Sequence, residues 1–279
     1  MGKPMKLKQT MTFSLALIAA LALAVWMSGC ATASAADASA APITLRVMTY
    51  NIQHGAGADD VIDLKRTAEA INHEKPDIVA LEEVDNGVKR TAGRDLTTEL
   101  AALTGLTGYF SNNFHFQGGL YGNAVLTRFP ILQSTNTHYQ MLRTNEQRGV
   151  IQLVLDVHGH KLLFMVTHID YRKDNAERLK NVAEMRQLIQ LYPGLPVILC
   201  GDFNDFPESP VHAEMKKTFE DTWELIGKGD GATFRSPDPK KRIDYIWILP
   251  DKSVVPLKAW VPDTQASDHR PFVADFQLK

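Results

Sequence analysis

The sequence contains very little cysteine: Cys30 and Cys200 are its only two among 279 residues. If Cys30 is modified or removed with the leader described below, Cys200 has no partner and no disulfide can form. The chain therefore depends on its hydrophobic core for stability. Cys200 ends the apolar run that begins at Val197, which predicts a buried, unreactive thiol rather than a nucleophile.

Two further absences narrow the functional classes. There is no CxxC and no HExxH motif, which argues against a zinc site. Basic residues do not predominate, because 30 Lys and Arg face 32 Asp and Glu, and loss of a leader with three lysines leaves 30 − 3 = 27 against 32, a charge near −5. This balance does not favour an electrostatic nucleic-acid binder, although a local basic patch is compatible with a negative total.

The first thirty residues differ in composition from the rest. Three lysines precede an apolar segment at residues 12–27, and Ser28-Gly29-Cys30 follows. This order predicts an export signal at residues 1–30, and the apolar segment is too short to favour a permanent membrane helix. Met27-Ser28-Gly29-Cys30 resembles the lipobox of bacterial lipoproteins, in which the cysteine is lipidated; the alternative is cleavage by a signal peptidase within residues 33–41.

Either route places the mature chain outside the cytoplasm, attached to a membrane if Cys30 is acylated and otherwise periplasmic or secreted. Residues 31–42 are rich in Ala and Ser and predict a flexible tether. Residues 43–279 have no low-complexity break and predict a single domain. Nothing in the sequence indicates a protein partner, so a monomer is expected.

Apolar periodicity predicts many strands with helices recurring between them. Strands are expected at residues 43–50, 77–81, 123–127, 131–142, 149–157, 161–166, 197–200, 242–249, 254–260 and 272–278. Helices are expected from Asp59 or Asp60 to Glu74, at 96–103, from Asp174 onward with Glu177 completing a capping box, and at 211–219. A Gly- and Asn-rich loop is expected after residue 103, and a His158-Gly159-His160 hairpin turn at 158–160. This pattern predicts an α/β fold, a sandwich of mixed sheets.

Polar side chains recur where the predicted strands end or begin. These are Asn51, Glu83, His168, Asp202, Asn204, Asp244, Asp268 and His269. If the strands converge on one edge, the side chains share a cleft, and so many carboxylates can stay ionised together only with a bound cation. Ligation by Glu, Asp and Asn selects a hard cation such as Mg²⁺, with Mn²⁺ as the alternative. Such a cation beside two histidines suits hydrolysis of a phosphate ester.

The motifs at these positions resemble those of the endonuclease/exonuclease/phosphatase superfamily, in particular its deoxyribonuclease and neutral sphingomyelinase branches. They occur in the order found in that family and span residue 43 to the C-terminus: Thr49-Tyr50-Asn51-Ile52, Leu81-Glu82-Glu83-Val84, Gly122-Asn123-Ala124-Val125-Leu126, Thr167-His168, Gly201-Asp202-Phe203-Asn204, Arg242-Ile243-Asp244-Tyr245 and Ser267-Asp268-His269-Arg270-Pro271. The resemblance implies a four-layer α/β-β/α sandwich with two packed mixed sheets flanked by helices.

The resemblance also implies a role for each position. Glu83 is similar to the principal metal ligand, with Asn51 and Asp268 supporting it. His269 is similar to the histidine that contacts the phosphate and transfers a proton, and Asp244 to the carboxylate that orients it. Asp202 and Asn204 resemble the pair that positions the attacking water and binds the phosphoryl group, and His168 matches a second histidine.

A few residues keep a structural interpretation. Glu82 stands where many members of the family have Gln, and together with Asp170 it is expected to support the site or to face solvent. Arg148 is expected to be a lone surface arginine, although contact with a phosphate is the alternative. Asp244 has an alternative as an ion-pair partner of Arg242.

The sequence thus predicts a divalent-metal-dependent phosphoesterase outside the cytoplasm, with a phosphodiesterase as the first interpretation. The substrate stays open between a lipid head group, a small phosphoester and nucleic acid. A secreted or surface-attached endonuclease similar to deoxyribonuclease is the main alternative, and a non-catalytic binding protein on the same scaffold is the second.

Overall fold

The computed structural model describes residue 2 and residues 43–279, and the account below concerns residues 43–279. The predicted export signal, the tether and Cys30 lie outside this part of the chain. Within it, no helix combines the length and the apolar character that crossing a membrane would require.

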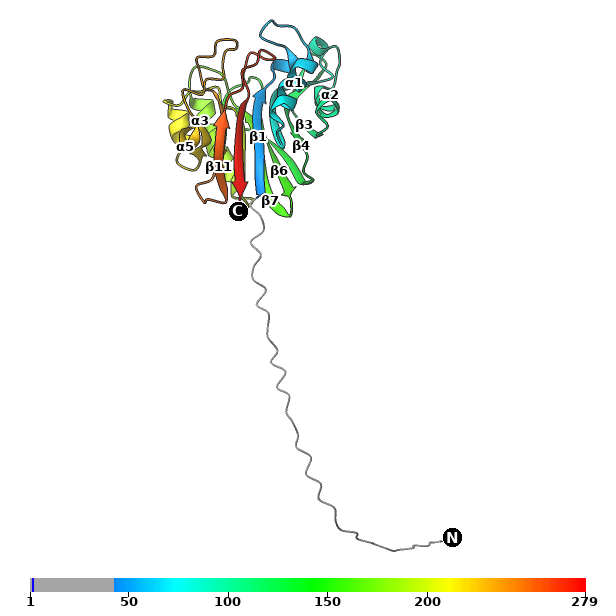
Figure 1. The fold of residues 1–279 in the computed structure, drawn as a ribbon, viewed down its shortest axis with the longest axis vertical. Helices are drawn as coiled ribbons and strands as arrows, with labels where there is room; N and C mark the ends of the chain where they lie inside the picture. The colour runs from blue at the N-terminus through cyan, green and yellow to red at the C-terminus, as the bar shows by residue number, and fades with distance from the viewer. Residues whose placement is uncertain (1, 3–42) are drawn as a thin grey trace. The chain divides into compact units, whose positions relative to one another are not determined.

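Two mixed sheets of six strands each form the centre of the domain. The first sheet has the order β11 (Val254–Trp260), β12 (Phe272–Leu278), β1 (Ile43–Asn51), β2 (Ile78–Asn86), β4 (Gly119–Thr127) and β3 (Thr107–Phe116). The second has the order β5 (Ile131–His138), β6 (Gly149–Val157), β7 (His160–His168), β8 (Val197–Asp202), β10 (Asp244–Ile248) and β9 (Glu220–Asp221). The C-terminal strand β12, red in Figure 1, lies between β11 and β1.

Helices cover the outer face of each sheet, so the predicted four-layer sandwich is confirmed. On the first sheet lie α1 (Leu64–Glu74) and α2 (Leu96–Thr104), and on the second α3 (Ala176–Ile189) and α4 (Pro210–Met215). Figure 1 shows α1 and α2 on one side of the domain and α3 on the other, near the short α5 (Thr222–Ile226). Two short 3₁₀ helices, η1 (Gln53–Gly55) and η2 (Lys89–Thr91), follow β1 and β2.

Alternation along the strands builds these layers. In β8, Ile198 and Cys200 face the core between the two sheets, whereas Val197 and Leu199 face the core beneath α3 and α4. Successive side chains of a strand point to opposite faces, so an uninterrupted apolar run is what a strand buried on both sides requires. Cys200 is fully buried, and burial raises the pKa of its thiol well above the ordinary value. The prediction of an unreactive thiol is consistent with this position.

Parallel pairing brings the predicted site residues to neighbouring strand ends. β1 and β2 are parallel, with Asn51 opposite Glu82. β7 and β8 are also parallel, with His168 opposite Asp202. β10 runs antiparallel to β8, so Asp244, at its start, lies opposite Asp202 as well. The sequence positions spread over two hundred residues therefore meet at one end of the sandwich.

The start of the first helix differs from the prediction. α1 begins at Leu64, and Asp63 is its N-cap, accepting a hydrogen bond from the Lys65 amide. Asp59 instead accepts two hydrogen bonds from Arg66. Three aspartates, Asp59, Asp60 and Asp63, precede this helix, and only the tertiary path of the loop decides which of them caps it.

A strand was also missed. The Gly- and Asn-rich segment predicted as a loop after residue 103 contains β3, which pairs with β4 through a tight turn at Gln117 and Gly118. β3 is an edge strand with mostly exposed or half-buried residues, so it lacks the apolar alternation from which a strand is recognised. Four other predictions were wrong in detail: β5 ends at His138, β10 begins at Asp244, α4 ends at Met215 instead of residue 219, and Asn175, not Asp174, is the N-cap of α3.

Replacing Gly201 with alanine is expected to lower the free energy of unfolding by about 3 kcal/mol, because overpacking at a strand contact forces the backbone apart. A Cβ atom at Gly201 would lie 1.9 Å from the carbonyl oxygen of Thr167 in the neighbouring strand β7, and Gly201 has a φ of 151°. Urea denaturation measures the change. Gly93→Ala is the control, since it also has a positive φ but open space around it; equal losses in both variants would show that the β7–β8 contact is not the cause.

Candidate active site

A cleft of about 360 Å³ lies at the end of the sandwich where the strand ends meet. Most of the predicted site residues line it: Glu83, His168, Asp202, Asn204, Asp268 and His269. Asn51 and Asp244 are buried behind this surface and reach it through hydrogen bonds to residues of the cleft. The structure thus brings together all eight positions singled out in the sequence.

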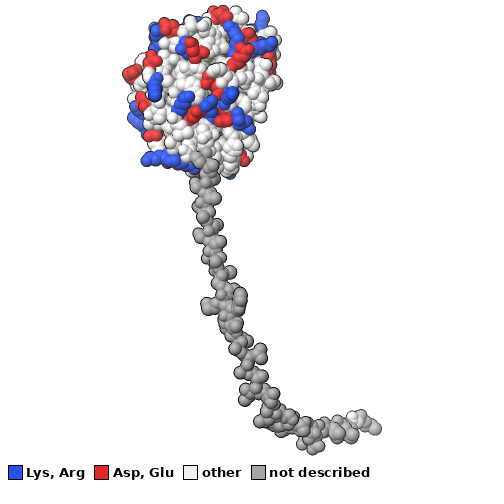
Figure 2. Space-filling model, viewed as in Figure 1, with Lys and Arg blue, Asp and Glu red and all other residues white. Residues whose placement is uncertain are grey.

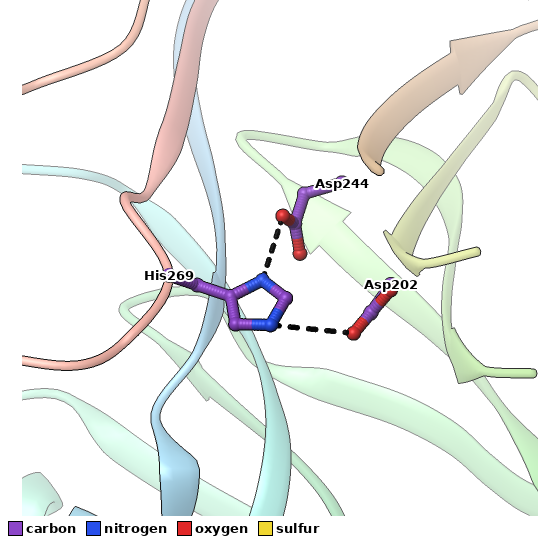
Figure 3. Close-up of side chains that lie close together, drawn as sticks. All are labelled: Asp202, Asp244 and His269. Atoms are coloured by element: carbon purple, nitrogen blue, oxygen red, sulfur yellow. Dashed lines mark hydrogen bonds and ion pairs between the residues drawn. The ribbon is translucent and has the colours of Figure 1, made fainter. Parts of the chain in front are cut away.

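His269 lies between two buried aspartates, as Figure 3 shows. Its Nδ1 is 2.9 Å from Oδ2 of Asp244, and its Nε2 is 3.7 Å from Oδ2 of Asp202. Burial alone would lower the pKa of His269, but Asp244 and then Asp202 outweigh it and raise the pKa to about 10. The imidazole is therefore cationic at neutral pH, with one N–H donated to Asp244 and the other facing Asp202 and the cleft.

Asp202 is held from both sides. Its Oδ1 accepts a hydrogen bond from the Asn204 amide at 2.8 Å, and its Oδ2 accepts one from Nδ2 of Asn51 at 3.0 Å. Burial and the charge of Asp244 raise the pKa of Asp202 above its ordinary value. A carboxylate with a raised pKa is a stronger base than a solvated one, which is the property a proton acceptor needs at neutral pH.

Asn51 links Asp202 to Glu83. The same Nδ2 that donates to Asp202 also donates to Oε1 of Glu83 at 3.1 Å. Glu83 itself lies in a β-bulge of β2, where residues 82 and 83 face only Asn123 of β4. Its φ of 58° is in the left-handed region, which costs free energy in a residue other than glycine and is characteristic of functional sites.

The donor set around Glu83 suits a hard divalent cation. Glu83 and Asp268 both line the cleft, and among the described residues no Lys or Arg forms an ion pair with Glu83. Asp268 has a long ion pair with Arg235, at 3.9 Å. Burial raises the pKa of Asp268 and the charge of Glu83 adds to this, while the neighbouring His269 opposes it. Carboxylate oxygens of this kind are the ligands that Mg²⁺ or Mn²⁺ prefers.

A second group of acidic and histidine side chains lies away from the cleft, and its carboxylates form ion pairs with Arg and Lys side chains of the protein. His212, Asp221 and Glu224 approach one another closely, but Arg242 donates to Asp221 at 2.6 Å and Lys216 pairs with Glu224. This cluster is an internal ion-pair network. Its geometry also excludes the alternative in which Asp244 pairs with Arg242, because Arg242 is engaged by Asp221.

His168 and Asn204 also line the cleft and contact each other. Nε2 of His168 lies 2.9 Å from Nδ2 of Asn204, so the amide donates and the ring nitrogen accepts. Burial, and then the charge of Arg148, lowers the pKa of His168 well below its ordinary value. His168 is therefore neutral, in contrast to His269, and its buried Nδ1 has no hydrogen-bond partner in the described part of the chain.

Arg148 is not the surface residue that the sequence predicted. Only 6 % of it is exposed, it lines the cleft, and its Nε has no hydrogen-bond partner among residues 43–279. Its closest carboxylate, Glu146, is 3.0 Å from one terminal nitrogen. The sequence could not reveal this, because Arg148 stands in a loop position and its neighbours in space include Tyr171, whose ring centre is 5.8 Å from the guanidinium.

Glu82 and Asp170 are both buried, so neither faces solvent. Glu82 accepts a hydrogen bond from Oγ1 of Thr49 at 3.0 Å, and burial raises its pKa well above the ordinary value. Asp170 accepts from Nε of Arg172 at 2.8 Å. Burial excludes the solvent-facing interpretation for both residues, and support of the site stays a prediction.

Several lining residues were not singled out from the sequence. They are Arg90, Phe114, Phe116, Tyr121, Glu146, Tyr171, Phe234 and Ile243. Phe114 and Phe116 belong to the strand that was predicted as a loop, so their shared face was not evident. No signal in the sequence marks the others, since single aromatic residues are more often part of a core.

The buried side chain of Arg178 links the loop that follows His168 to the loop that contains Asn204. The side chain of Arg178, on α3, donates to the carbonyl oxygens of Asp170, Arg172 and Asn204, at 2.7 to 3.2 Å. Asn204 has a φ of 48°, a left-handed conformation that needs such support. All three bonds come from Nη1, while Nη2 donates to Asn175 and Nε lies 3.3 Å from Asp205, so the fork of the guanidinium ties both loops to the start of α3.

Replacing Arg178 with lysine is expected to lower kcat by about 10- to 100-fold, because small displacements of reacting groups have effects of this size. A lysine keeps the charge, but its donors sit on a single nitrogen, so it cannot also reach Asn175 and Asp205 as Nη2 and Nε of Arg178 do. Steady-state kinetics measure the loss, with thermal melting to confirm folding. Arg186→Lys, on the same helix and paired with Glu214, is the control; equal kinetics in the two variants would rule out the positioning effect.

Comparison with known proteins gives consistent matches. A sequence profile of the endonuclease/exonuclease/phosphatase family matches residues 48–269. The protein YbhP of Escherichia coli K12 is 26% identical over 251 residues, which cover 84% of this chain and 97% of YbhP.

Solved structures agree with the sequence matches. A mannosyl-6-phosphatase from Bacteroides thetaiotaomicron superposes with a TM-score of 0.70 at 16% identity, covering 83% of this chain and 99% of its own. The catalytic domain of human Nocturnin, with a bound sulfate anion, superposes with a TM-score of 0.65 at 23% identity, covering 85% and 95%. At these identities the likeness establishes the fold.

Proposed function

The chain belongs to the endonuclease/exonuclease/phosphatase family, whose members are metal-dependent hydrolases of phosphoester bonds, and from this we propose that it is an extracytoplasmic phosphodiesterase. The observation that carries the proposal is the placement of cationic His269 between Asp202 and Asp244, in the same cleft as Glu83 and Asp268. A proton acceptor, a cation and a metal-binding pair then face one bound phosphoryl group.

In this proposal Asp202 accepts the proton of the attacking water. Asn51 and the Asn204 amide occupy one lone pair on each carboxylate oxygen, which fixes the orientation of the base toward the cleft. The water oxygen forms a bond to phosphorus as the P–O bond to the leaving group breaks in line with it, and the leaving oxygen departs with the bonding electrons and takes its proton from solvent. Asn204, held to His168, contributes a polar contact to the phosphoryl group.

His269 stabilises the charge that develops on the phosphoryl oxygens. Its Nδ1 proton is held by Asp244, so the Nε2 proton is the one directed into the cleft. A fixed cation in a buried site acts more strongly than it would in water. Mg²⁺, or Mn²⁺ in its place, held by Glu83 and Asp268 with Asn51 supporting Glu83, would when bound neutralise the same oxygens.

The charge of the cleft favours a diester over a monoester. Arg90 is neutralised by Asp85, to which it donates two hydrogen bonds of 2.8 Å. Arg148 is paired with Glu146 at 3.0 Å through one terminal nitrogen, but its Nε has no hydrogen-bond partner among residues 43–279, so part of this guanidinium is left to contact substrate. One such group suits the single negative charge of a phosphodiester, whereas a dianionic monoester would favour a second.

Charge on the surface does not favour long nucleic acids as substrate. On the face shown in Figure 2, Lys and Arg side chains are interspersed with Asp and Glu, and the sequence carries 30 basic against 32 acidic residues. Binding to a nucleic-acid backbone draws on a row of basic side chains and weakens steeply with salt. We therefore propose small phosphoesters and lipid head groups as substrates ahead of DNA. We also propose that the protein is exported, monomeric and attached to a membrane through Cys30.

Removal of divalent metal tests the proposal. Activity on bis-p-nitrophenyl phosphate is expected to disappear in EDTA and to return with Mg²⁺ or Mn²⁺, with Asp202→Ala as the inactive reference. p-Nitrophenyl phosphate is expected to be hydrolysed more slowly than the diester. A faster monoester reaction would assign a phosphatase instead, and salt-sensitive nicking of plasmid DNA at a higher rate than either would assign a nuclease.

A further inference from the structure

Glu146 is a carboxylate of the cleft to which the chemistry above gives no part. Three other carboxylates line the same cleft: Glu83, Asp202 and Asp268. Glu83 and Asp268 are proposed to hold the metal, and Asp202 to accept a proton. A further negative charge in a site that binds an anion opposes the binding. Glu146 therefore weakens the binding of any phosphoryl group that comes close to it.

The segment before β6 holds Glu146 beside Arg148. Nε2 of Gln147, the residue between them, donates to the carbonyl oxygens of Tyr139 and Arg148, both at 2.7 Å. The Tyr139 amide in turn donates to the Arg148 carbonyl oxygen at 3.0 Å. These bonds fix the backbone from which Glu146 and Arg148 both reach the cleft, so the two charges are in place before a substrate binds.

The charge of Glu146 is only partly neutralised. Its Oε1 lies 3.0 Å from Nη2 of Arg148, but this oxygen has no hydrogen-bond partner within residues 43–279. Burial raises the pKa of Glu146, Arg148 opposes this by favouring the charged form, and the charge of Glu83 adds to the rise. The effect of Glu83 places Glu146 near the carboxylate that is proposed to hold the metal. A phosphoryl group between Glu83 and Arg148 therefore lies close to the Glu146 carboxylate as well.

We propose that Glu146 is a specificity-determining residue, whose charge makes the cleft discriminate against phosphomonoesters in favour of phosphodiesters. A phosphoryl oxygen bound to the Arg148 guanidinium through a hydrogen bond of about 2.8 Å lies within about 8 Å of the Glu146 oxygen. At about that separation, one further negative charge on the ligand changes its binding by at least about tenfold. A dianionic monoester carries this second charge and a diester does not. This inference rests on the proposed phosphodiesterase function.

A matched pair of substrates tests the inference in the full-length protein with Mg²⁺. At slightly alkaline pH p-nitrophenyl phosphate is a dianion. p-Nitrophenyl methylphosphonate has the same leaving group and nearly the same size, but a methyl group replaces the second charged oxygen. Glu146→Gln is expected to raise the ratio of kcat/KM for the phosphate to kcat/KM for the phosphonate by about tenfold. Glu146→Asp keeps the charge, so its ratio is expected to stay within about threefold of the wild type.

Glu208→Gln is the control, since it removes an exposed glutamate outside the cleft lining and should keep the wild-type ratio. Because a ratio does not depend on the amount of folded protein, a folding defect in one variant does not affect the comparison. A ratio that does not rise in Glu146→Gln would overturn the inference. An equal rise in Glu146→Asp would overturn it too, because shape rather than charge would be the cause, as would an equal rise in Glu208→Gln.

Hydrolysis of bis-p-nitrophenyl phosphate by the same preparations separates this inference from the function on which it rests. Wild-type activity on the diester with an unchanged ratio in Glu146→Gln would overturn the inference alone. Failure of the wild type to hydrolyse the diester would overturn the proposed function, and the inference with it.

Discussion

Replacing His269 with alanine is expected to lower kcat/KM for a phosphodiester by about 10³-fold, within the range measured for loss of a proton-transfer or charge-stabilising group. The imidazolium is held between Asp244 and Asp202 at 2.9 and 3.7 Å. Its removal takes away the buried cation, so Asp244 and Asp202 both lose the positive charge that lies between them. The measurement is initial-rate kinetics on bis-p-nitrophenyl phosphate at saturating Mg²⁺.

The size of the effect has an internal check. Asp244→Asn keeps the shape of the partner but no longer stabilises the cationic ring, so a loss of about 10²-fold is expected. Because the two residues act as a unit, the double variant should be little worse than His269→Ala. His160→Ala, at an exposed histidine in the β6–β7 hairpin, is the matched control. Additive losses in the double variant would mean that Asp244 does not act through His269.

Replacing Glu83 with glutamine is expected to weaken Mn²⁺ or Mg²⁺ binding by at least about 100-fold, because a hard cation depends on charged oxygen ligands and loses affinity steeply when one is neutralised. The amide preserves the size of the side chain and its place in the bulge. Isothermal titration with Mn²⁺ measures the affinity without reference to turnover. Activity at a fixed, low metal concentration should fall in parallel and recover partly at high metal.

Glu82 supplies the control for this experiment. It is the neighbouring glutamate in the same strand, buried and bonded to Thr49. Glu82→Gln removes the same ionisable group one residue away, and Mn²⁺ affinity is expected to stay within about threefold of the wild type. If both variants lost affinity equally, general charge in the cleft rather than ligation by Glu83 would account for metal binding.

The strand ends were predictable from sequence because their chemistry follows from the geometry of a sheet. Asn51, His168 and Asp202 each end an apolar run, and the carboxyl ends of parallel strands lie on one edge. Asp268 and His269 follow no such run, and the order of the motifs gave them their expected roles. The alternation of strands and helices predicted a sandwich of mixed sheets in the same way, and the four layers came from the family resemblance.

The other half of the cleft could not be predicted, because it depends on contacts between elements. Phe116 faces the site only through the pairing of β3 with β4, and β3 carries no apolar alternation of its own. Arg148 looks like a surface residue in the sequence and is buried only by its neighbours in space. Residues at strand ends can be recognised from the local sequence, whereas the rest of the cleft lining comes from segments that are distant in the sequence.

The bulge at Glu83 has a consequence for anyone who would transplant this site into another protein. In a regular strand, residues 82 and 83 would point to opposite faces and the pairing with β4 would continue without interruption. The side chain of Glu83 instead leaves β2 from a left-handed residue that has no partner of its own in the ladder. A recipient scaffold that copied the side chains onto ideal strands would turn this carboxylate away from Asp268, so the irregular backbone has to be transferred together with the residue.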